Sequence, residues 1–456
     1  MTEPPPRPGA PADGKQQPEE ADLLRDILRA PGYLKVLVFS ALLGVPVSLA
    51  AFWVLVGLHE LEHFLWADLP HDLGWDTPPW WWPFPLLLVA GVLVGLVATH
   101  LPGAGGHVPA AGLHTGGASS VALPGVLLAA AACLPFGAVL GPEAPLIALG
   151  GGLALLFRDL ARAQATPQST ALLGAAGAAA AIAAIFGNPL VAAVLLIEVA
   201  GVGGPQLFAV MLPALLSSGV GALVFTGFGR WTGLETGTLR IELPGPVPRL
   251  DAGDVLWGVL IALALAVLLQ PVMRAGQWVV SFVAADVLSR TVLCALGAAA
   301  CAALYALATD RSPAEVALSG QATLTELAAD PYAWSVGALL AVLLFKAVAY
   351  ALCLGSLRGG PVFPALFLGA AAGVLLAPLP GLGLGPAVAA GMAAAAASTL
   401  RLPVSSVVLV ALLLGSPAMM PVVILAAVVA FVTTELLPTG GDKASGRRAA
   451  EAGGAA

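Results

Sequence analysis

Residues 141–150 read Gly-Pro-Glu-Ala-Pro-Leu-Ile-Ala-Leu-Gly, and residues 360–369 read Gly-Pro-Val-Phe-Pro-Ala-Leu-Phe-Leu-Gly. In both segments a Gly-Pro-x-x-Pro start is followed at the same spacing by Leu-Gly. A second pair of segments is also related: residues 175–189 (AAGAAAAIAAIFGNP) and 389–403 (AAGMAAAAASTLRLP) share the opening Ala-Ala-Gly and the closing proline without a gap. The two pairs occur in the same order in each half. The sequence therefore predicts two structural repeats, and we expect their topology to be inverted.

The composition predicts a chain that lipid solvates. Of the 456 residues, 59% are hydrophobic and 10% are charged, and the mean hydropathy is +0.94. Stretches long enough to cross a bilayer as helices occur at 36–57, 84–101, 206–228, 254–273 and 334–354. Shorter apolar runs bounded by Gly, Pro or Asn, which are typical of broken helices, occur at 144–157, 189–201, 361–378 and 402–415. We expect an all-α polytopic membrane protein with many tilted and broken helices.

The polar segments divide the chain. We expect a disordered cytoplasmic tail over 1–30, a first membrane repeat over 31–239, a linker over 240–254, a second repeat over 255–437 and a disordered cytoplasmic tail over 438–456. Basic residues flank the first and last spans, so the positive-inside rule places both termini in the cytoplasm. The composition, with four lysines among 19 basic residues, is typical of a GC-rich bacterial genome and indicates a plasma membrane.

Charge and cysteine content exclude several classes of partner. The net charge is −7 and no basic stripe occurs, so we expect no nucleic-acid partner. The four cysteines stand singly in apolar segments without a CxxC pair, so they are interpreted as small core residues. We expect no cofactor and no metal.

The Gly-Pro-x-x-Pro starts suit an anion. Prolines occupy first-turn positions, so only the two residues between them keep free backbone donors, and each helix start also carries a positive dipole end. These donors are predicted at Glu143 and Ala144 in the first repeat and at Val362 and Phe363 in the second. A glycine-rich turn over 103–109 is a third candidate, because glycine lets backbone N–H groups approach an ion closely.

Glu143 is the ionisable residue that distinguishes the two repeats. A carboxylate between apolar runs is expensive in a membrane and is a functional hypothesis by default. Its counterpart in the second repeat is Val362, so the repeated fold does not require a carboxylate at this corner. The alternative is that Glu143 only caps its own helix.

At these motifs the sequence resembles the CLC family of chloride channels and chloride/proton exchangers, from about residue 36 to residue 437. Gly105-Gly106-His107-Val108-Pro109 is similar to the family's GSGIP, Gly141 to Pro145 to GREGP, and Gly360 to Pro364, with Arg358-Gly359 before it, to GGxFxP. The segment from Phe186 to Glu198 is similar to a further family helix.

The resemblance implies a homodimer with one anion path per subunit and a glutamate that competes with the anion for the outer site. Glu143 takes that position here, and its protonation would let an anion enter. The resemblance implies that the anion is chloride. The alternative function is that of a chloride/proton or fluoride/proton antiporter. The implied backbone donors are Gly105, Gly106, His107, Val108, Glu143, Ala144, Val362 and Phe363.

Several departures from the family pattern concern selectivity and proton coupling. Gly106 stands where the family usually has an ion-coordinating serine. The neighbouring His107 either supplies a donor or a pH response, or only packs or bonds a backbone carbonyl. Val199 stands where exchangers carry an inner glutamate, which favours a channel. Glu198 is either a proton relay or part of an ion pair with Lys346 or Arg401. Beyond Leu437 the hydrophilic sequence predicts that the family's last helix and its tyrosine are missing.

A competing hypothesis comes from residues 59–63, His-Glu-Leu-Glu-His. This HExxH pattern places His59 and His63 on one helix face with Glu60 beside them, as in zinc metalloproteases. A third ligand is required, and no aspartate lies in a suitable apolar setting. An amphipathic helix end at the membrane interface is the alternative interpretation.

Overall fold

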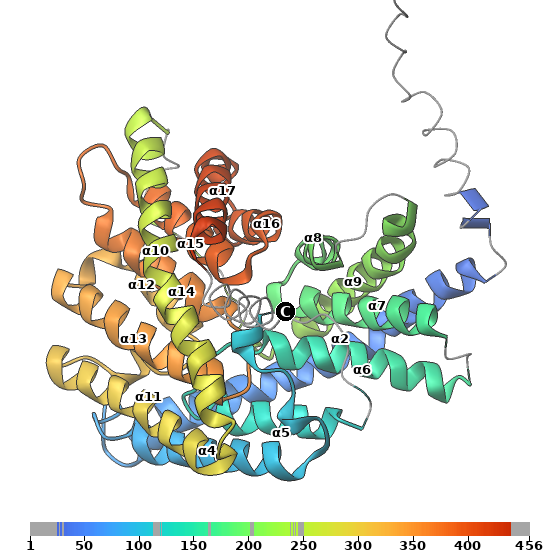
Figure 1. The fold of residues 1–456 in the computed structure, drawn as a ribbon, viewed down its shortest axis with the longest axis horizontal. Coiled ribbons are helices and arrows are strands. Elements are labelled where there is room, and N and C mark those ends of the chain that lie inside the picture. The colour runs from blue at the N-terminus through green and yellow to red at the C-terminus, as the bar shows by residue number, and fades with distance from the viewer. Residues whose placement is uncertain are drawn as a thin grey trace, which may run out of the picture.

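The computed structural model describes residues 25, 26, 28, 29, 32–112, 119, 121–162, 166–200, 205–237, 239, 241, 243, 244 and 250–438. Within these residues the regular elements are helices (Figure 1). The expected tail residues 1–24 and 439–456 and part of the expected linker lie outside the described residues.

The first half of the chain forms α2 to α9. Their bounds are α2 Tyr33–His63, α3 Leu69–Asp72, α4 Pro83–His100, α5 Leu123–Cys133, α6 Glu143–Leu160, α7 Pro167–Phe186, α8 Pro189–Ala200 and α9 Pro205–Thr232. A π-helical segment, Phe64–Asp68, joins α2 to α3, and short 3₁₀ turns occur at Pro102–Gly105 and Pro109–Ala111.

The second half forms α10 to α17. Their bounds are α10 Ala252–Val283, α11 Val287–Thr309, α12 Gln321–Ala329, α13 Val336–Ser356, α14 Val362–Leu376, α15 Leu384–Leu400, α16 Pro403–Leu414 and α17 Met420–Leu436. Short 3₁₀ turns occur at Pro313–Glu315, Pro331–Ala333 and Pro417–Met419. Helix α10 begins inside the stretch assigned to the linker, because Asp251 and Asp254 form a reciprocal cap at its start.

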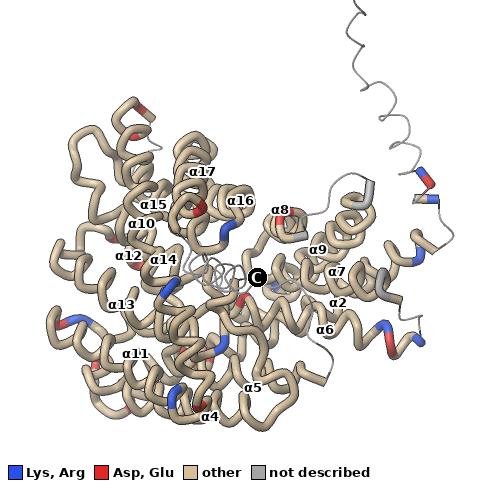
Figure 2. The backbone as a smooth tube through the Cα atoms, viewed as in Figure 1, with Lys and Arg blue, Asp and Glu red and all other residues tan. Residues whose placement is uncertain are grey.

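Eight helical segments of the described chain are long and apolar enough to cross a membrane. They include all five stretches that the hydropathy pattern predicted. The further three are Ser169–Phe186, Val287–Thr309 and Pro417–Leu436. The four shorter runs form α6, α8, α14 and α16, and the chain is a multi-pass membrane protein. Figure 2 shows how sparsely charged residues are distributed over the backbone.

The repeated glycines explain the closest helix crossings. Helix α6 packs on α7 and α14 packs on α15. A Cβ added to Gly150 would overlap the carbonyl of Gly177, and one added to Gly369 would overlap the carbonyl of Gly391. Only glycine permits this approach of the two backbones at either crossing, so the second repeated segment has the same packing role in both halves.

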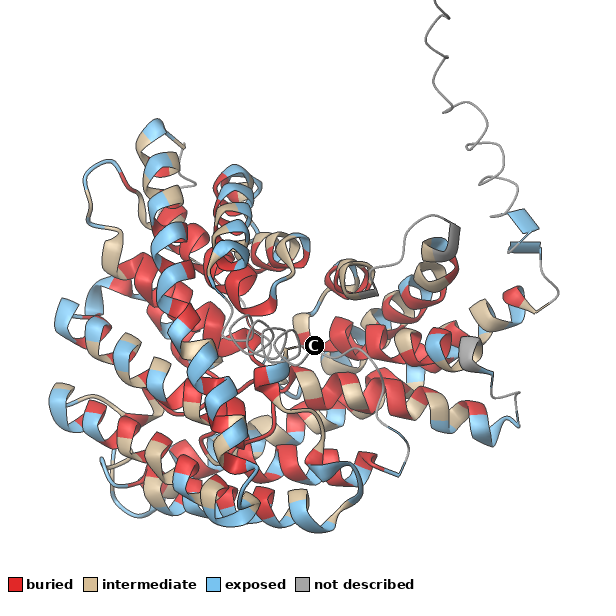
Figure 3. Ribbon diagram, viewed as in Figure 1, coloured by how far each residue is buried: buried red, intermediate tan, exposed pale blue. Residues whose placement is uncertain are grey.

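The two repeats meet at equivalent positions. The Gly141 N–H donates to the Gly360 carbonyl at 2.8 Å, and the Gly360 N–H donates to the Gly141 carbonyl at 2.6 Å. A reciprocal antiparallel pair between equivalent residues indicates a local two-fold relationship, as the inverted repeat requires. Residues 137–143 and 353–374, which include this pair, are buried throughout. Figure 3 shows that buried residues concentrate in the interior of the molecule.

Candidate functional site

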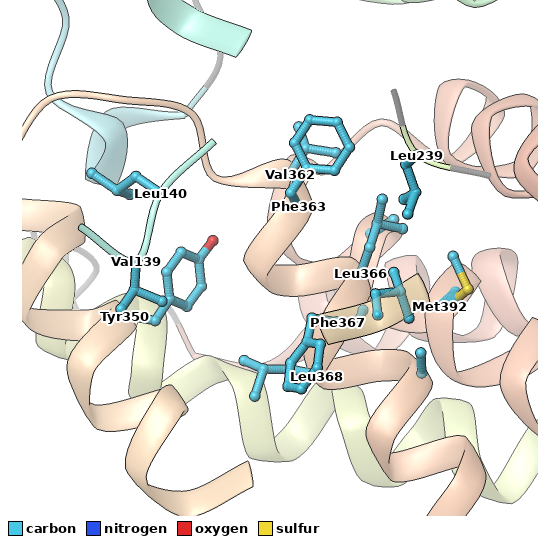
Figure 4. Packing of buried hydrophobic residues seen from close by; sticks show 14 of the residues in the cluster. Val139, Leu140, Leu239, Tyr350, Val362, Phe363, Leu366, Phe367, Leu368 and Met392 are labelled. Carbon is cyan, nitrogen blue, oxygen red and sulfur yellow. The ribbon is translucent and has the colours of Figure 1, made fainter. Parts of the chain in front are cut away.

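The starts of α6 and α14 converge at the paired glycines. Each helix begins directly after Gly-Pro, and each has its first-turn amides at the corner where the repeats meet. Figure 4 shows Val362 and Phe363 at the start of α14, with Leu366 and Phe367 further along the helix. Two positive dipole ends therefore face one buried region, which is the arrangement that suits a negative charge.

The side chain of Glu143 occupies this corner. It is 1% exposed, and its Oε1 accepts a hydrogen bond from the Phe363 N–H at 3.0 Å. The backbone N–H groups of Val362 and of Glu143 itself also interact with the carboxylate. Its Oε2 has no hydrogen-bond partner in the described structure. The carboxylate of one repeat thus accepts a hydrogen bond from the start of the equivalent helix in the other repeat.

The surroundings of this carboxylate are apolar and tight. A Cβ added to Gly360 would overlap Oε2 of Glu143, so the glycine leaves the space that the carboxylate fills. The Phe363 ring lies 5.7 Å from the ring of Phe186, measured between centroids. The buried Tyr350 donates its hydroxyl to the Pro361 carbonyl at 2.7 Å. Tyr350 was not predicted from the sequence, because a tyrosine within an apolar span gives no signal of its position.

The glycine-rich turn is left-handed over residues 103–106, where φ lies between 49° and 99°. Gly106 donates its N–H to the Gly103 carbonyl at 2.8 Å, so this predicted anion donor is engaged within the turn. The His107 Nε2 lies 2.9 Å from the Gly112 carbonyl. This contact corresponds to the carbonyl-bonding interpretation of His107.

Arg358 connects this turn with the α14 start. Its Nε donates to the Ala104 carbonyl at 3.1 Å and its Nη1 to the Leu357 carbonyl at 3.2 Å, and the residue is 9% exposed. The sequence pattern placed Arg358 only in the approach to the Gly-Pro motif. The criterion applied to Glu143, an ionisable group between apolar runs, would have identified it.

Glu198 holds the start of α16. Its Oε1 accepts from the Val404 N–H at 2.9 Å, and its Oε2 accepts from the Ser405 N–H at 2.7 Å and the Ser405 hydroxyl at 2.6 Å. No ion pair joins it to Lys346 or Arg401 among the described residues, contrary to the ion-pair alternative.

The two basic residues considered as partners of Glu198 have other contacts. Lys346 is fully buried and donates to the carbonyls of residues 315–318 at 3.1 to 3.2 Å. The Arg401 Nη1 lies 3.5 Å from the carboxylate of Glu435.

A cavity of about 380 Å³ reaches the residue before the Glu143 helix. We call it the acidic cavity, because its lining includes His59, Glu62, Glu235 and Glu326 together with Leu140 and Pro142.

The second histidine of the HExxH pattern lies outside the lining of this cavity. The His63 Nδ1 contacts Asp68 at 3.2 Å. In the described part of the chain, no three potential metal ligands gather around the pattern.

Comparison with known proteins gives consistent matches. Residues 107–435 match the family described as voltage gated chloride channel. Over 159 residues the chain is 34% identical to the ion-transport protein YfeO of Salmonella choleraesuis (strain SC-B67) and 33% identical to that of Salmonella newport (strain SL254). Each match covers 34% of this chain and 38% of the relative.

Solved structures share the fold at low sequence identity. A slow cyanobacterial Cl⁻/H⁺ antiporter matches with a TM-score of 0.74 at 17% identity, covering 89% of this chain and 95% of that one. A CLC-type fluoride/proton antiporter matches with a TM-score of 0.66 at 20% identity, covering 88% and 96%. A eukaryotic CLC transporter matches with a TM-score of 0.68 at 18% identity, covering 89% and 72%.

Proposed function

The chain belongs to the voltage-gated chloride channel (CLC) family, and on that premise we propose that it conducts a small anion, chloride foremost, along a path gated by Glu143. The CLC family transports anions, so the protein is a transporter and not an enzyme. This identity replaces the metalloprotease hypothesis that the His59–His63 pattern suggested.

The position of the Glu143 carboxylate carries the proposal. It accepts the Phe363 N–H at the meeting of two helix starts, where a small anion would find the same donors. A carboxylate and an anion cannot both occupy one buried site, because their charges repel each other at low dielectric. Protonation of Glu143 would remove its charge, weaken its hold on these amides and free the site. Ala144, Val362 and Phe363 would then serve as anion donors, with Gly105, His107 and Val108 further along the path.

The residues around Glu198 support weak proton coupling. Both carboxylate oxygens of Glu198 are held by the α16 start, and the next residue is Val199. A relay role would require Glu198 to leave three hydrogen bonds during each cycle. A channel-like path is therefore our proposal. Proton-coupled chloride or fluoride exchange is the alternative, because two of the similar structures are antiporters of those ions.

Reconstitution tests both parts of the proposal. Liposomes with an anion gradient are prepared with wild type, Glu143→Ala and the control Glu60→Ala, which removes an exposed carboxylate of α2. We expect anion efflux from wild type and the control with little proton movement, and faster efflux from Glu143→Ala. Absence of flux for chloride, bromide, nitrate and fluoride alike would reject anion transport. Stoichiometric proton movement would reject the channel in favour of the exchanger.

Assembly and placement are also proposed. We expect a homodimer in the plasma membrane, with the polar segments before α2 and after α17 in the cytoplasm, as the flanking basic residues indicate. Cross-linking in membranes and labelling of single cysteines introduced into the two terminal segments test these two statements. Monomeric protein, or labelling of a terminal segment from outside intact cells, would contradict them.

A further inference from the structure

Arg358 carries a positive charge without a carboxylate partner. The residue is 9% exposed, and its side chain donates hydrogen bonds to two backbone carbonyls, those of Ala104 and Leu357. Among the described residues, no Asp or Glu oxygen lies within 4.0 Å of its guanidinium. Carbonyls satisfy part of the guanidinium's donor capacity and leave its net charge in place.

The fully buried Lys346 has a different environment. Lys346 has four carbonyls around its amine and lies over the Phe367 ring, 4.8 Å from the ring centroid. These contacts enclose the Lys346 ammonium on the side of residues 315–318. Arg358 instead lies between the glycine-rich turn and the α14 start, which both belong to the proposed path.

One contact and one neighbour in the chain place Arg358 beside that path. A side-chain carbon added to Gly105 would lie 3.6 Å from the Arg358 Cγ, so the arginine stem packs along the turn. Gly360, two residues after Arg358, packs against the Glu143 carboxylate. Arg358 thus lies two residues before a glycine that borders the Glu143 carboxylate, and that carboxylate accepts its hydrogen bond from the Phe363 N–H.

We propose that Arg358 is the fixed positive charge of the anion path and sets the affinity of the path for its anion. While Glu143 is ionised, its negative charge offsets part of the field of the guanidinium. When the carboxylate is neutral, no negative charge opposes the field of Arg358 in this region of low dielectric. A small anion then compensates the positive charge of the guanidinium. The proposal rests on the function proposed above.

The alternative is that Arg358 only fastens the turn through the Ala104 carbonyl. Three variants distinguish the effect of the charge from the effect of the side chain's shape. Arg358→Lys keeps the charge, and Arg358→Gln and Arg358→Met remove it. The control is Arg290→Gln, since Arg290 is also an arginine that donates to a carbonyl, that of Phe282 at 2.6 Å, away from the site.

The measurement is the chloride concentration that gives half-maximal flux in liposomes at constant ionic strength. We expect the neutral variants to raise it by about tenfold or more, and Arg358→Lys and Arg290→Gln to stay within about threefold of wild type. An unchanged value for Arg358→Gln or Arg358→Met would overturn the proposal. It would also be overturned if Arg358→Lys were as impaired as the neutral variants, or if both neutral variants failed to fold while Arg358→Lys folded.

Calorimetric titration of the detergent-solubilised proteins with sodium chloride separates this inference from the proposed function. If wild type binds chloride in an Arg358-dependent manner but shows no flux, the proposed function fails and the role of Arg358 stands. If wild type shows flux and the neutral variants bind chloride as wild type does, the role of Arg358 fails and the function stands. Absence of both binding and flux in wild type rejects both.

Discussion

The Oε1 of Glu143 lies 3.0 Å from the backbone nitrogen of Phe363, so the first residue of helix α6 binds the start of its counterpart in the other repeat. The repeats are otherwise joined here by the reciprocal hydrogen bonds of Gly141 and Gly360. The backbone hydrogen bonds between the repeats are thus symmetric, whereas the side chains at the two helix starts differ. One repeat supplies the carboxylate, and the other supplies amide donors with valine at the equivalent position.

The first prediction concerns the charge of Glu143. Replacing it by glutamine keeps the size of the side chain and removes the negative charge that repels an anion. We expect Glu143→Gln to conduct at neutral pH at least as fast as wild type does in acid, with a much weaker pH dependence than wild type. Flux in liposomes between about pH 3.5 and about pH 7.5, a range that includes the ordinary glutamate pKa of about 4.3, measures this. A wild-type pH dependence in the glutamine variant would show that another group gates the path.

The second prediction concerns the helix crossing at Gly369 and Gly391. A methyl group at Gly391 would overlap the Gly369 carbonyl, so Gly391→Ala should destabilise the protein by roughly 1–3 kcal/mol, as overpacking does. The control is Gly219→Ala on α9, because a Cβ there meets nothing within 4 Å. Thermal unfolding of detergent-solubilised protein checks both. Equal stability of the two variants would show that the α14–α15 crossing adjusts without cost.

Sequence patterns predicted the fold because membrane-spanning helices are long, continuous apolar runs that stand out in the sequence. The five long apolar stretches correspond to five of the eight membrane-length segments, and the Gly-Pro boundaries correspond to the short helices at the site. The alignment of Gly150 with Gly369 indicated the two repeats, and the structure adds that these glycines make the α6–α7 and α14–α15 crossings.

Contacts between distant segments were not predictable in the same way. The sequence suggests a relay or an ion pair for Glu198, whereas its carboxylate binds the amides of Val404 and Ser405, more than 200 residues away in the chain. Free backbone donors at a helix start attract a carboxylate as well as an anion does, and no sequence pattern indicates which of the two they bind. The same limitation applies to Arg358 and the Ala104 carbonyl.

The third prediction concerns the cap that Glu198 provides. Because its two oxygens satisfy two amides and a hydroxyl at the start of α16, Glu198→Gln should destabilise the protein by about 0.5–2 kcal/mol, the usual cost of a lost cap. Ser405→Ala removes the hydroxyl partner alone. Since the residues are in contact, their double variant should depart from additivity by roughly 0.5–3 kcal/mol. Additive unfolding free energies would mean that the carboxylate and the hydroxyl act independently.

The fourth prediction concerns the acidic cavity beside Pro142. Partial burial raises the pKa of Glu326, and the nearby Glu315 raises it further, while Arg311 acts in the opposite direction. Glu326 therefore takes up a proton at a higher pH than an ordinary glutamate. As the pH falls, the cavity loses this negative charge and should admit anions more readily. With Glu326→Gln the charge is absent at every pH, so flux at neutral pH should rise and the response to acid should shrink.

This effect is separated from the gate by measuring it in the Glu143→Gln background, where position 143 carries no titrating charge. The other titratable residues of the cavity lining, His59, Glu62 and Glu235, are left intact, so a residual pH response is expected. The matched control is Glu60→Gln, which removes an exposed carboxylate of α2 outside the cavity lining. If Glu326→Gln and Glu60→Gln gave the same flux at each pH, the cavity would not lie on the route by which anions reach Glu143.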